Sequence, residues 1–245
     1  EQRLDFHLEK RTEQLLKEAI PLLEQVSGDR IRHEFDLILA GNHCADIMQR
    51  LQDFSILKYI HPYFKWDGKN SQVLELALNK PIEKNWGIPD NIGNIPVHRF
   101  IAYLVAFSFI PPAQVNSFSK RLRLSANLKT ALLQNNTLLA ELPGLMAAKP
   151  SKVVKRLEKT LPVVLYTLHL MSPDEKVKQI LELYQIKWRS IKPISNGETL
   201  KEMGLSPGPV YQKILFRLRA GWLDGEIHSK EEEIEYLRKL LSESK

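Results

Sequence analysis

Two basic side chains follow a proline-flanked glycine near the end of the chain. In the stretch GLSPGPVYQKILFRLRAGWLDGE, Gly204 to Glu226, Gly208 lies between two prolines, and Lys213 and Arg217 come one helical turn apart. A helix that starts at Pro209 exposes unpaired backbone amides and a partial positive charge, and a glycine beside them lets another backbone come close. This pattern suits the binding of a phosphate chain. A packed corner between two helices is the competing interpretation.

Two helices are predicted around this turn. A short one, Asn196 to Met203, can end at Gly204, because glycine reaches the left-handed conformation without strain. The next starts at about Pro209 with Gly208 as its N-cap, because a proline is tolerated at the first helical position. Apolar residues then recur every fourth position, the period of a helix with one buried face. They are Val210, Ile214, Leu218 and Trp222.

Other residues of the second helix are candidates for contact with a bound chain. Val210 and Tyr211 belong to its first turn, beside the proposed phosphate position. Phe216 falls outside the apolar stripe, so it either packs on a neighbouring element or offers a stacking surface.

Three more basic clusters occur in the sequence. They are Lys120, Arg121 and Arg123; Lys152, Lys155, Arg156 and Lys159; and Lys187, Arg189 and Lys192 around Trp188. Members of the second cluster are three and four residues apart, so they share one face of a helix, where they repel each other unless an anion lies across them. A solvated helix face is the commoner explanation for any single run. Together with the Gly208 turn, the clusters favour RNA or DNA as a partner.

Composition agrees with a globular, basic protein. The 245 residues are 43% hydrophobic and 26% charged, with a net charge of +6, which is enough for one large or two small cores and fits an anionic partner. Cys44 is the single cysteine, so the chain cannot form a disulfide framework, and a reducing, cytoplasmic location is expected. The apolar runs from Phe100 and Leu161 are shorter than the ~20 residues of a membrane span, so they predict core helices and no membrane partner.

Signatures of catalysis are missing from this sequence. It contains no phosphate-cradling glycine loop and no pair of aspartates separated by one residue, as a two-metal phosphoryl-transfer site often supplies. His33-Glu34 lacks a second histidine four residues later, and His43-Cys44 lacks a second ligand pair. We therefore assign no catalytic residue, no metal ligand and no cofactor to this chain.

Helical spacing recurs from end to end, which predicts an all-α fold. The predicted early helices contain Leu15, Leu16, Ala19, Leu22 and Leu23; then Ile31, Phe35, Ile38 and Leu39, ending near Gly41; then Ile47, Leu51 and Phe54. Residues 79–96, rich in Pro, Gly and Asn, predict a long loop. Ser172, followed by Pro173, and Ser229 are predicted N-caps. The last helix carries Ile234, Leu237 and Leu241.

Two segments resemble a known family. The first, VSGDRIRHEFDLILAGNHCADIMQRLQDFSILKYIHPYF, begins at Val26; Arg30, Ile31 and Glu34 match the family pattern, and Asp29 stands for the usual glutamate. The second, ISNGETLKEMGLSPGPVYQKILFRLRAGWLDGEI, begins at Ile194. Both are similar to class II tRNA nucleotidyltransferases (CCA-adding enzymes) and bacterial poly(A) polymerases, in the region that follows the nucleotide-selecting motif and in the tail.

The resemblance implies a multi-helix neck, body and tail. Residues 1–66 are the expected end of the neck with the first body helices, 67–195 the helical body, and 196–245 the tail with the Gly/Pro turn. Body and tail would clamp a tRNA or other RNA, which makes Arg30 a further candidate RNA contact alongside the basic residues above.

The catalytic head of the family is not represented in this sequence, which contains none of its Gly-Gly-x-Val-Arg-Asp, Asp-x-Asp and Glu-Asp-x-x-Arg motifs. With the charged start of the chain, which lacks methionine, this predicts a fragment of a longer nucleotidyltransferase, inactive alone. The parent enzyme would use Mg²⁺ with ATP or CTP.

Two other functions are compatible with the sequence: a helical scaffold that meets proteins, and a grip on duplex DNA. Neither the product of the parent enzyme (CCA, CC, A or poly(A)) nor the oligomeric state follows from the residues.

Overall fold

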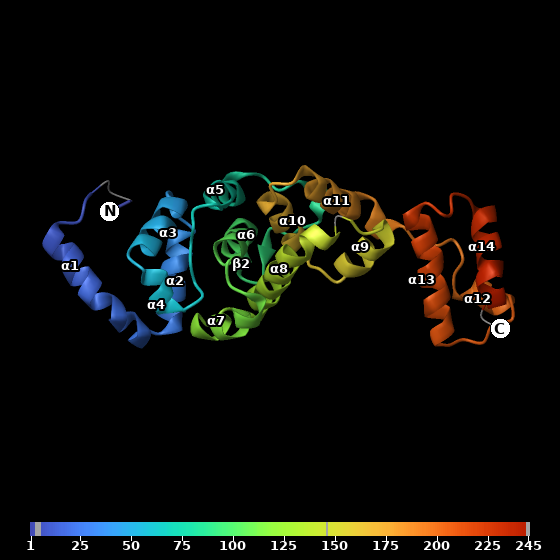
Figure 1. Ribbon diagram of the computed structural model, residues 1–245, viewed down its shortest axis with the longest axis horizontal. Helices are drawn as coiled ribbons and strands as arrows, with labels where there is room; N and C mark the ends of the chain where they lie inside the picture. Colours follow the sequence, from blue (N-terminus) through green and yellow to red (C-terminus); the bar gives the residue numbers. More distant parts are fainter. Residues whose placement is uncertain (3–5, 146, 244–245) are drawn as a thin grey trace. The chain divides into compact units, whose positions relative to one another are not determined.

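A computed structural model describes residues 1–2, 6–145 and 147–243 of the chain, and the regular elements of the described part are almost all helices (Figure 1). The predicted all-α fold is confirmed. The chain divides into two compact units: unit 1 comprises Glu1–Leu142 and Thr160–Lys178, and unit 2 comprises Pro143–Lys159 and Gln179–Lys245.

Unit 1 contains most of the elements. In chain order they are α1 (Lys10–Ala19), the 3-10 helix η1 (Ile20–Gln25), α2 (Gly28–Ile38), α3 (Cys44–Asp53), α4 (Ile56–Ile60), α5 (Ser71–Asn79), η2 (Lys84–Trp86), β1 (Asn91–Ile92), β2 (Ile95–Pro96), α6 (Val97–Ala106), η3 (Pro112–Gln114), α7 (Val115–Arg121), most of α8 (Ala126–Leu145), α10 (Pro162–Met171) and the start of α11 (Glu175–Ile186). The loop predicted at 79–96 is confirmed, interrupted by η2 and the two-residue antiparallel strands β1 and β2.

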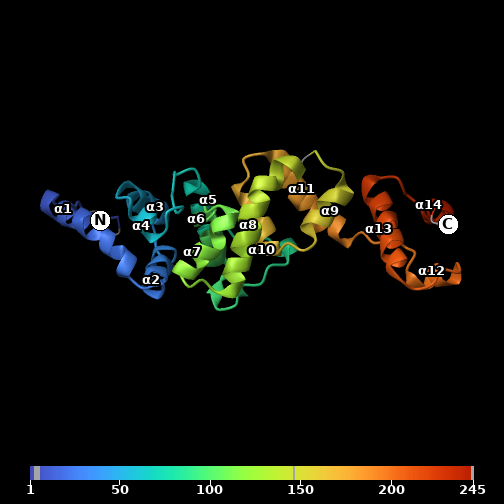
Figure 2. The same ribbon diagram turned by 60° about the horizontal axis from the view of Figure 1, so that its bottom comes forward.

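Helix α6 lies at the centre of unit 1. Eight of its ten residues are buried, and it packs against α5 and α10 (Figure 2). An aromatic cluster extends this core: the ring centroid of Phe107 lies 5.7 Å from Phe35, 5.3 Å from Phe64 and 4.8 Å from Phe118, each pair edge to face. Such pairs each stabilise by about 0.5–1.5 kcal/mol beyond the burial of their area. Both apolar runs, in α6 and α10, are core helices as predicted.

The three early helices form near the predicted positions, but Leu22 and Leu23 fall in the 3-10 helix η1, and burial differs from the prediction in α1 and α3. Helix α1 buries none of its residues, and Leu15 is 56% exposed. Helix α2 buries Ile31 and Phe35 as predicted, whereas α3 buries Met48 and leaves the predicted Ile47 and Leu51 half-buried. None of the described helices is long and apolar enough to cross a membrane.

One predicted helix start is wrong. Helix α11 begins at Glu175, and the Asp174 carboxylate, not Ser172, accepts the hydrogen bond of Lys176 N, at 2.8 Å. Ser172 instead ends α10, since its N–H donates to the carbonyl of Leu168 at 3.0 Å. The predicted cap at Ser229 is confirmed by its hydroxyl, which accepts from Glu232 N at 3.2 Å.

Unit 2 is the smaller one. Its elements are the end of α8, α9 (Pro150–Leu157), most of α11, η4 (Trp188–Ser190), α12 (Gly197–Glu202), α13 (Pro209–Asp224) and α14 (Lys230–Glu243). Six fully buried aliphatic side chains from α12, α13, the following turn and α14 form its core: Leu200, Ile214, Leu218, Ile227, Leu237 and Leu240. In the last helix, Leu237 is buried as predicted, whereas Ile234 and Leu241 are only half-buried.

A buried carboxylate joins three elements of unit 2. Glu233, on α14, is 1% exposed. Its oxygens accept hydrogen bonds from the backbone N–H groups of Ile194, at 2.9 Å, and Ser195, at 2.6 Å, and from the indole of Trp222 on α13. Burial alone would raise the pKa of Glu233, but these hydrogen bonds outweigh it and lower the pKa below its ordinary value. Glu233 therefore holds the segment before α12 against α13 and α14.

Candidate nucleic-acid interface

Helix α13 begins as the proline pattern predicts. Its first residue is Pro209 and its N-cap is Gly208, while Gly204 ends α12 in the left-handed region at φ +86. Gly208 itself has an extended backbone, and a Cβ there would meet only the carbonyl oxygen of Ser206, at 4.0 Å. The fold does not require a glycine at 208, so its lack of a side chain leaves room for a ligand at the positive end of the helix.

The first three turns of α13 present one exposed strip. Val210, Lys213, Phe216 and Arg217 are all exposed. The predicted buried stripe is right for Ile214 and Leu218 and wrong for Val210, which is 43% exposed because the aliphatic core starts one turn later. We call Val210, Lys213, Phe216 and Arg217 the α13 strip.

Tyr211 is half-buried and supports the turn before the helix. Its hydroxyl donates to the carbonyl of Leu205 at 2.9 Å, and its ring packs on the aliphatic core. It therefore positions the Gly208 turn, next to the strip.

Helix α9 lies beside α13 and adds basic side chains to the strip. The carboxylate of Asp224, at the end of α13, accepts from Ser151 N at 2.8 Å and Ser151 Oγ at 2.7 Å, which caps the start of α9. The ammonium of Lys155 lies over the ring of Phe216, 5.0 Å from its centroid. Lys155 and the α13 strip thus form one surface, and Lys152 is also exposed on α9.

The four basic residues around α9 do not share one helical face. Helix α9 ends at Leu157, so Lys159 lies in the turn that follows, and Arg156 is half-buried. Leu161, which precedes Pro162, has an extended backbone. A residue before a proline disfavours the helical conformation, so the helix cannot continue through this position. Lys152 and Lys155 are the exposed basic pair of α9.

Arg217 belongs to a small polar network. Its guanidinium interacts with the hydroxyl of Tyr236, which donates to Glu226 Oε2 at 3.2 Å. Glu226 also pairs with Lys149, at 3.4 Å. Burial, aided by Glu226, raises the pKa of Tyr236, which favours the neutral hydroxyl that donates to Glu226.

The remaining basic clusters differ in their surroundings. Arg121 donates to the backbone carbonyls of Val26, at 2.9 Å, and Leu23, at 2.8 Å, so its role is structural. Arg123 pairs with Asp29 at 2.8 Å. The other members of these clusters are exposed: Lys120, Lys187, Arg189 and Lys192. Arg30 is exposed as well. Arg30 lies on α2 and belongs to unit 1, whereas the α13 strip belongs to unit 2.

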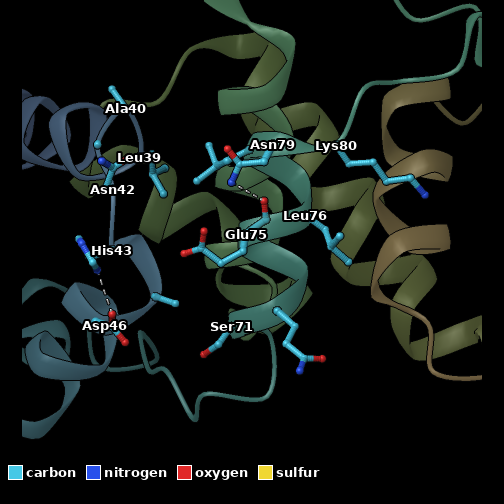
Figure 3. A pocket seen from close by; sticks show the side chains of 14 residues that line it. Leu39, Ala40, Asn42, His43, Asp46, Ser71, Glu75, Leu76, Asn79 and Lys80 are labelled. Carbon is cyan, nitrogen blue, oxygen red and sulfur yellow. Dashed lines mark hydrogen bonds and ion pairs between the residues drawn. The ribbon is translucent and has the colours of Figure 1, made fainter.

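A wide cavity of about 1240 Å³ opens in unit 1 between the α2–α3 turn and α5 (Figure 3). Its charged lining consists of two carboxylates, Asp46 and Glu75, and Lys80, with His43 at 3.5 Å from Asp46. The carboxylates outnumber the lysine, so we do not assign the cavity to nucleic acid. Among the described residues, no three His, Cys, Asp or Glu side chains are grouped to hold a metal ion.

Comparisons with known proteins agree on one group. The sequence profile of a family described as "Probable RNA and SrmB- binding site of polymerase A" matches residues 5–67. The chain is 26% identical to an A-adding tRNA nucleotidyltransferase of Geobacter sulfurreducens, over 96% of this chain and 27% of that protein. It is 22% identical to a CCA-adding enzyme of Leuconostoc mesenteroides, over 97% of this chain and 56% of that protein. The chain thus spans about a quarter to about half of these relatives.

Solved structures show the same fold. The chain superimposes on the Thermotoga maritima CCA-adding enzyme complexed with tRNA with a TM-score of 0.69 and 22% identity, over 100% of this chain and 58% of that one. A CCA-adding enzyme in complex with CTP gives 0.68 and 22%, over 98% and 57%. The resemblance inferred from the Val26 and Ile194 segments is confirmed.

Proposed function

We propose that this chain, which is like the helical C-terminal portion of class II CCA-adding enzymes and poly(A) polymerases, binds tRNA for a nucleotidyltransferase. It would position the RNA while a catalytic head outside this sequence adds nucleotides to the 3′ end. The neck, body and tail divisions at residues 66 and 195 are part of this proposal. The observation that carries it is the surface in unit 2 formed by the α13 strip and Lys155.

The chemistry of this surface suits a sugar-phosphate chain. The start of α13 offers backbone amides and a partial positive charge beside Gly208, where a phosphate fits. Lys213 and Arg217 extend positive charge along the next two turns. Phe216, 42% exposed beneath Lys155, offers a ring face on which a base can stack, an interaction of about 1–3 kcal/mol.

Support also comes from the relatives, in their own terms. The matched family carries RNA binding in its description, and one structural neighbour was solved with tRNA. CCA-adding neighbours were solved with CTP and with ATP, so we infer these nucleotides, with Mg²⁺, as substrates and cofactor of the parent enzyme. The chain alone should add no nucleotides. Cytoplasmic location is part of the same proposal.

Salt dependence tests the RNA-binding surface. A filter-binding titration of tRNA should give an affinity that falls steeply with salt, because each phosphate contact contributes a log–log slope of roughly 0.7 to 0.9. Lys213→Ala with Arg217→Ala removes two such contacts, so the slope should flatten by roughly 1.4 to 1.8. Arg238→Ala with Lys239→Ala is the matched control, since both side chains are exposed on α14 of the same unit.

Equal losses in the two double variants would mean that only net charge matters, and the assignment of the α13 strip would be wrong. If the intact chain fails to bind tRNA even in dilute buffer, the result favours the alternative function, a helical scaffold that binds proteins. That alternative has one observation in its favour, the apolar residues that α1 and its neighbours leave exposed, Leu15, Leu22 and Leu37. Competition by duplex DNA as effective as that by tRNA would favour the DNA grip.

A substitution at Gly208 separates fold from function. A Cβ fits at this position, so Gly208→Ala should leave the melting temperature within about 2 °C of the wild type. The methyl group would hold a phosphate away from the α13 amides, and the affinity for tRNA should fall about tenfold, the loss of one charge-assisted contact. Melting curves and filter binding on the same preparation check both parts. A large loss of stability without loss of affinity would assign Gly208 to a packed corner instead.

A further inference from the structure

We propose that a cavity in unit 1, between α2, α6 and the start of α8, is a second phosphate-binding site. The cavity measures about 390 Å³, and three arginines from different elements line it: Arg32 on α2, Arg99 on α6 and Arg123 just before α8. It lies entirely within unit 1, whereas the α13 strip belongs to unit 2. Its assignment to the RNA backbone rests on the proposed function; its assignment to phosphate does not.

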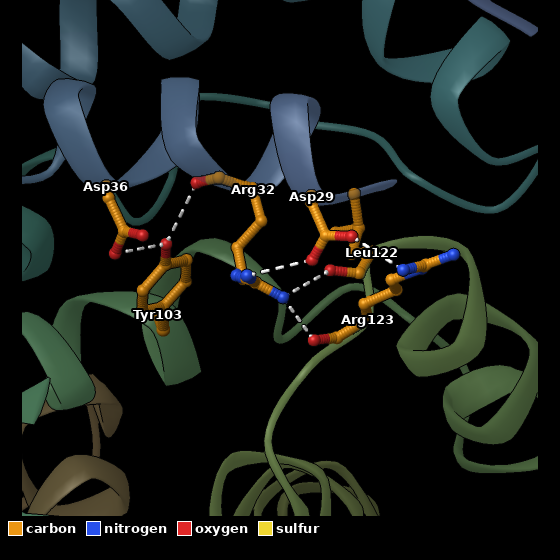
Figure 4. Close-up of polar contacts among 6 residues, drawn as sticks. All are labelled: Asp29, Arg32, Asp36, Tyr103, Leu122 and Arg123. Atoms are coloured by element: carbon orange, nitrogen blue, oxygen red, sulfur yellow. Dashed lines mark hydrogen bonds and ion pairs between the residues drawn. The ribbon is translucent and has the colours of Figure 1, made fainter. Parts of the chain in front are cut away.

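The charges around the cavity do not balance. Asp29 pairs with Arg32, at 3.0 Å, and with Arg123, at 2.8 Å (Figure 4). Asp36 is the other carboxylate, and Arg99 lies 3.9 Å from it. Three guanidinium groups therefore face two carboxylates. The surplus positive charge lies in a partly enclosed site, where it is screened less than on an open surface.

Arg99 has donors to spare. In the part of the chain that the structure describes, its guanidinium makes the 3.9 Å ion pair with Asp36 and no hydrogen bond. The same Asp36 oxygen already accepts from the hydroxyl of Tyr103, at 2.9 Å. A guanidinium carries five N–H donors in a planar fork that matches two phosphate oxygens. Arg99 is thus positioned at the cavity by α6, with its hydrogen-bonding capacity still available.

Helix α8 points its positive end at the same cavity. The 20-residue helix starts at Ala126, and Ser125 and Leu128 line the cavity. The hydroxyl of Ser125 accepts from Leu128 N at 3.3 Å, so one of the first amides is capped. The remaining amides of the first turn and the helix dipole favour an anion here.

A hydrogen bond from Arg32 stabilises the turn that carries Arg123. Arg123 adopts φ +49, the left-handed region that costs a non-glycine residue about 1–2 kcal/mol. The Arg32 guanidinium donates to the backbone carbonyl of Arg123 and thereby secures that conformation. Arg32 is therefore the positioning residue of the site, whereas Arg99 and the outer edge of Arg123 are the groups free to meet a ligand.

Arg99→Gln is the variant that tests the site, because Arg99 makes no hydrogen bond that the fold needs. Inorganic phosphate, compared with sodium chloride at equal ionic strength, should raise the melting temperature of the full chain, and Arg99→Gln should abolish this rise. Arg11→Gln, an exposed arginine on α1, is the control and should retain it. If phosphate protects the wild type and Arg99→Gln equally, or neither, the proposal is overturned.

A variant that is expected to strengthen phosphate binding distinguishes a binding role from a purely structural effect. Asp36→Asn keeps an oxygen acceptor for Tyr103 and removes one negative charge beside Arg99, so phosphate should bind about fivefold more tightly. A weaker or unchanged affinity, with circular dichroism showing a folded chain, counts against the site.

Titration with tRNA then identifies the source of the phosphate. If the site holds the RNA backbone, Arg99→Gln weakens tRNA binding three- to tenfold and Arg11→Gln does not. If it holds a free phosphoester, the phosphate effect is lost in Arg99→Gln while tRNA affinity is unchanged. Should the wild type ignore tRNA but still respond to phosphate through Arg99, the proposed function fails and this site stands.

Discussion

Gly28→Ala is expected to destabilise unit 1 by about 2 to 3 kcal/mol, the cost of overpacking a filled site. A Cβ at Gly28 would lie 2.0 Å from the backbone carbonyl oxygen of Arg121. No rotation of a side chain can relieve a clash with backbone, so either α2 or the end of α7 has to move. The melting temperature should fall by about 4 to 12 °C, as expected for a chain of this size.

Gly41→Ala is the matched control within the same unit. Its Cβ would meet the carbonyl oxygens of Leu37 and Ile38 at 3.4 and 3.7 Å, which is ordinary contact. Urea unfolding followed by circular dichroism compares the two variants. If both lose the same stability, the close approach at Gly28 is not what holds α2, and the effect reduces to glycine-to-alanine propensity.

The contact at Gly28 also affects the cavity lined by Arg32, Arg99 and Arg123, which we call the arginine cavity. Helix α2 begins at Gly28 and carries Asp29 and Arg32 in its first two turns, while Arg123 follows α7. A shift of α2 against α7 would separate Asp29 from Arg123. Gly28→Ala should therefore weaken the protection by phosphate more than its loss of stability alone explains, which links the packing of α2 to the chemistry of the site.

Local signals in the sequence were sufficient for most of the predicted helices, although not for the start of α11, and for one half of the interface. Pro209 and Gly208 fix the start of α13 because proline restricts φ and lacks an N–H, and the serine hydroxyl caps α14 at Ser229. Lys213 and Arg217 are exposed because they lie off the apolar stripe. Signals of this kind depend only on neighbours within one turn.

Contacts between distant residues were not predictable in the same way. Lys155 meets Phe216 because α9 packs beside α13, where Asp224 also binds the start of α9, and no periodicity encodes that pairing. Asn136, a polar residue inside α8, is fully buried because its amide donates to the carbonyls of Phe107 and Ile110, at 3.0 and 2.7 Å, which closes the end of α6. In sequence it looks like any exposed helical asparagine.

The arginine cavity could not be predicted from the sequence, for a related reason. Arg99 has no other arginine or lysine close to it in the sequence, and Arg32 has only Arg30 two positions away, so neither belongs to one of the predicted basic clusters. Arg121 and Arg123 do join one, yet their guanidinium groups serve backbone carbonyls and Asp29. A run of basic residues in the sequence shows only that charge is concentrated locally along the chain. A binding site requires side chains from distant parts of the chain to lie close together in the fold.

Glu233→Ala is expected to have the largest effect on stability in unit 2, about 3 to 5 kcal/mol. The carboxylate accepts from the backbone N–H groups of Ile194 and Ser195 and from the indole of Trp222. Truncation leaves three donors without an acceptor: the Ser195 N–H is buried, and the Ile194 N–H and the Trp222 indole are partly buried, so water replaces the lost carboxylate only in part. Glu235→Ala, at an exposed position of the same helix, should change stability by less than about 0.5 kcal/mol.

The pH dependence gives this prediction a second, independent sign. Because the folded pKa of Glu233 lies below its ordinary value of 4.5, its contribution to stability is fully present above about pH 4.5 and is lost as the pH falls through the folded pKa. Glu233→Gln keeps the volume but has no charge to lose, so unit 2 should unfold less steeply with acid in this variant. Urea midpoints of wild type and Glu233→Gln between pH 3 and 7, followed by tryptophan fluorescence, measure the difference. Parallel curves would show that folding does not lower the pKa of Glu233, and the charge of the carboxylate would then add nothing to the hydrogen bonds that hold the segment before α12.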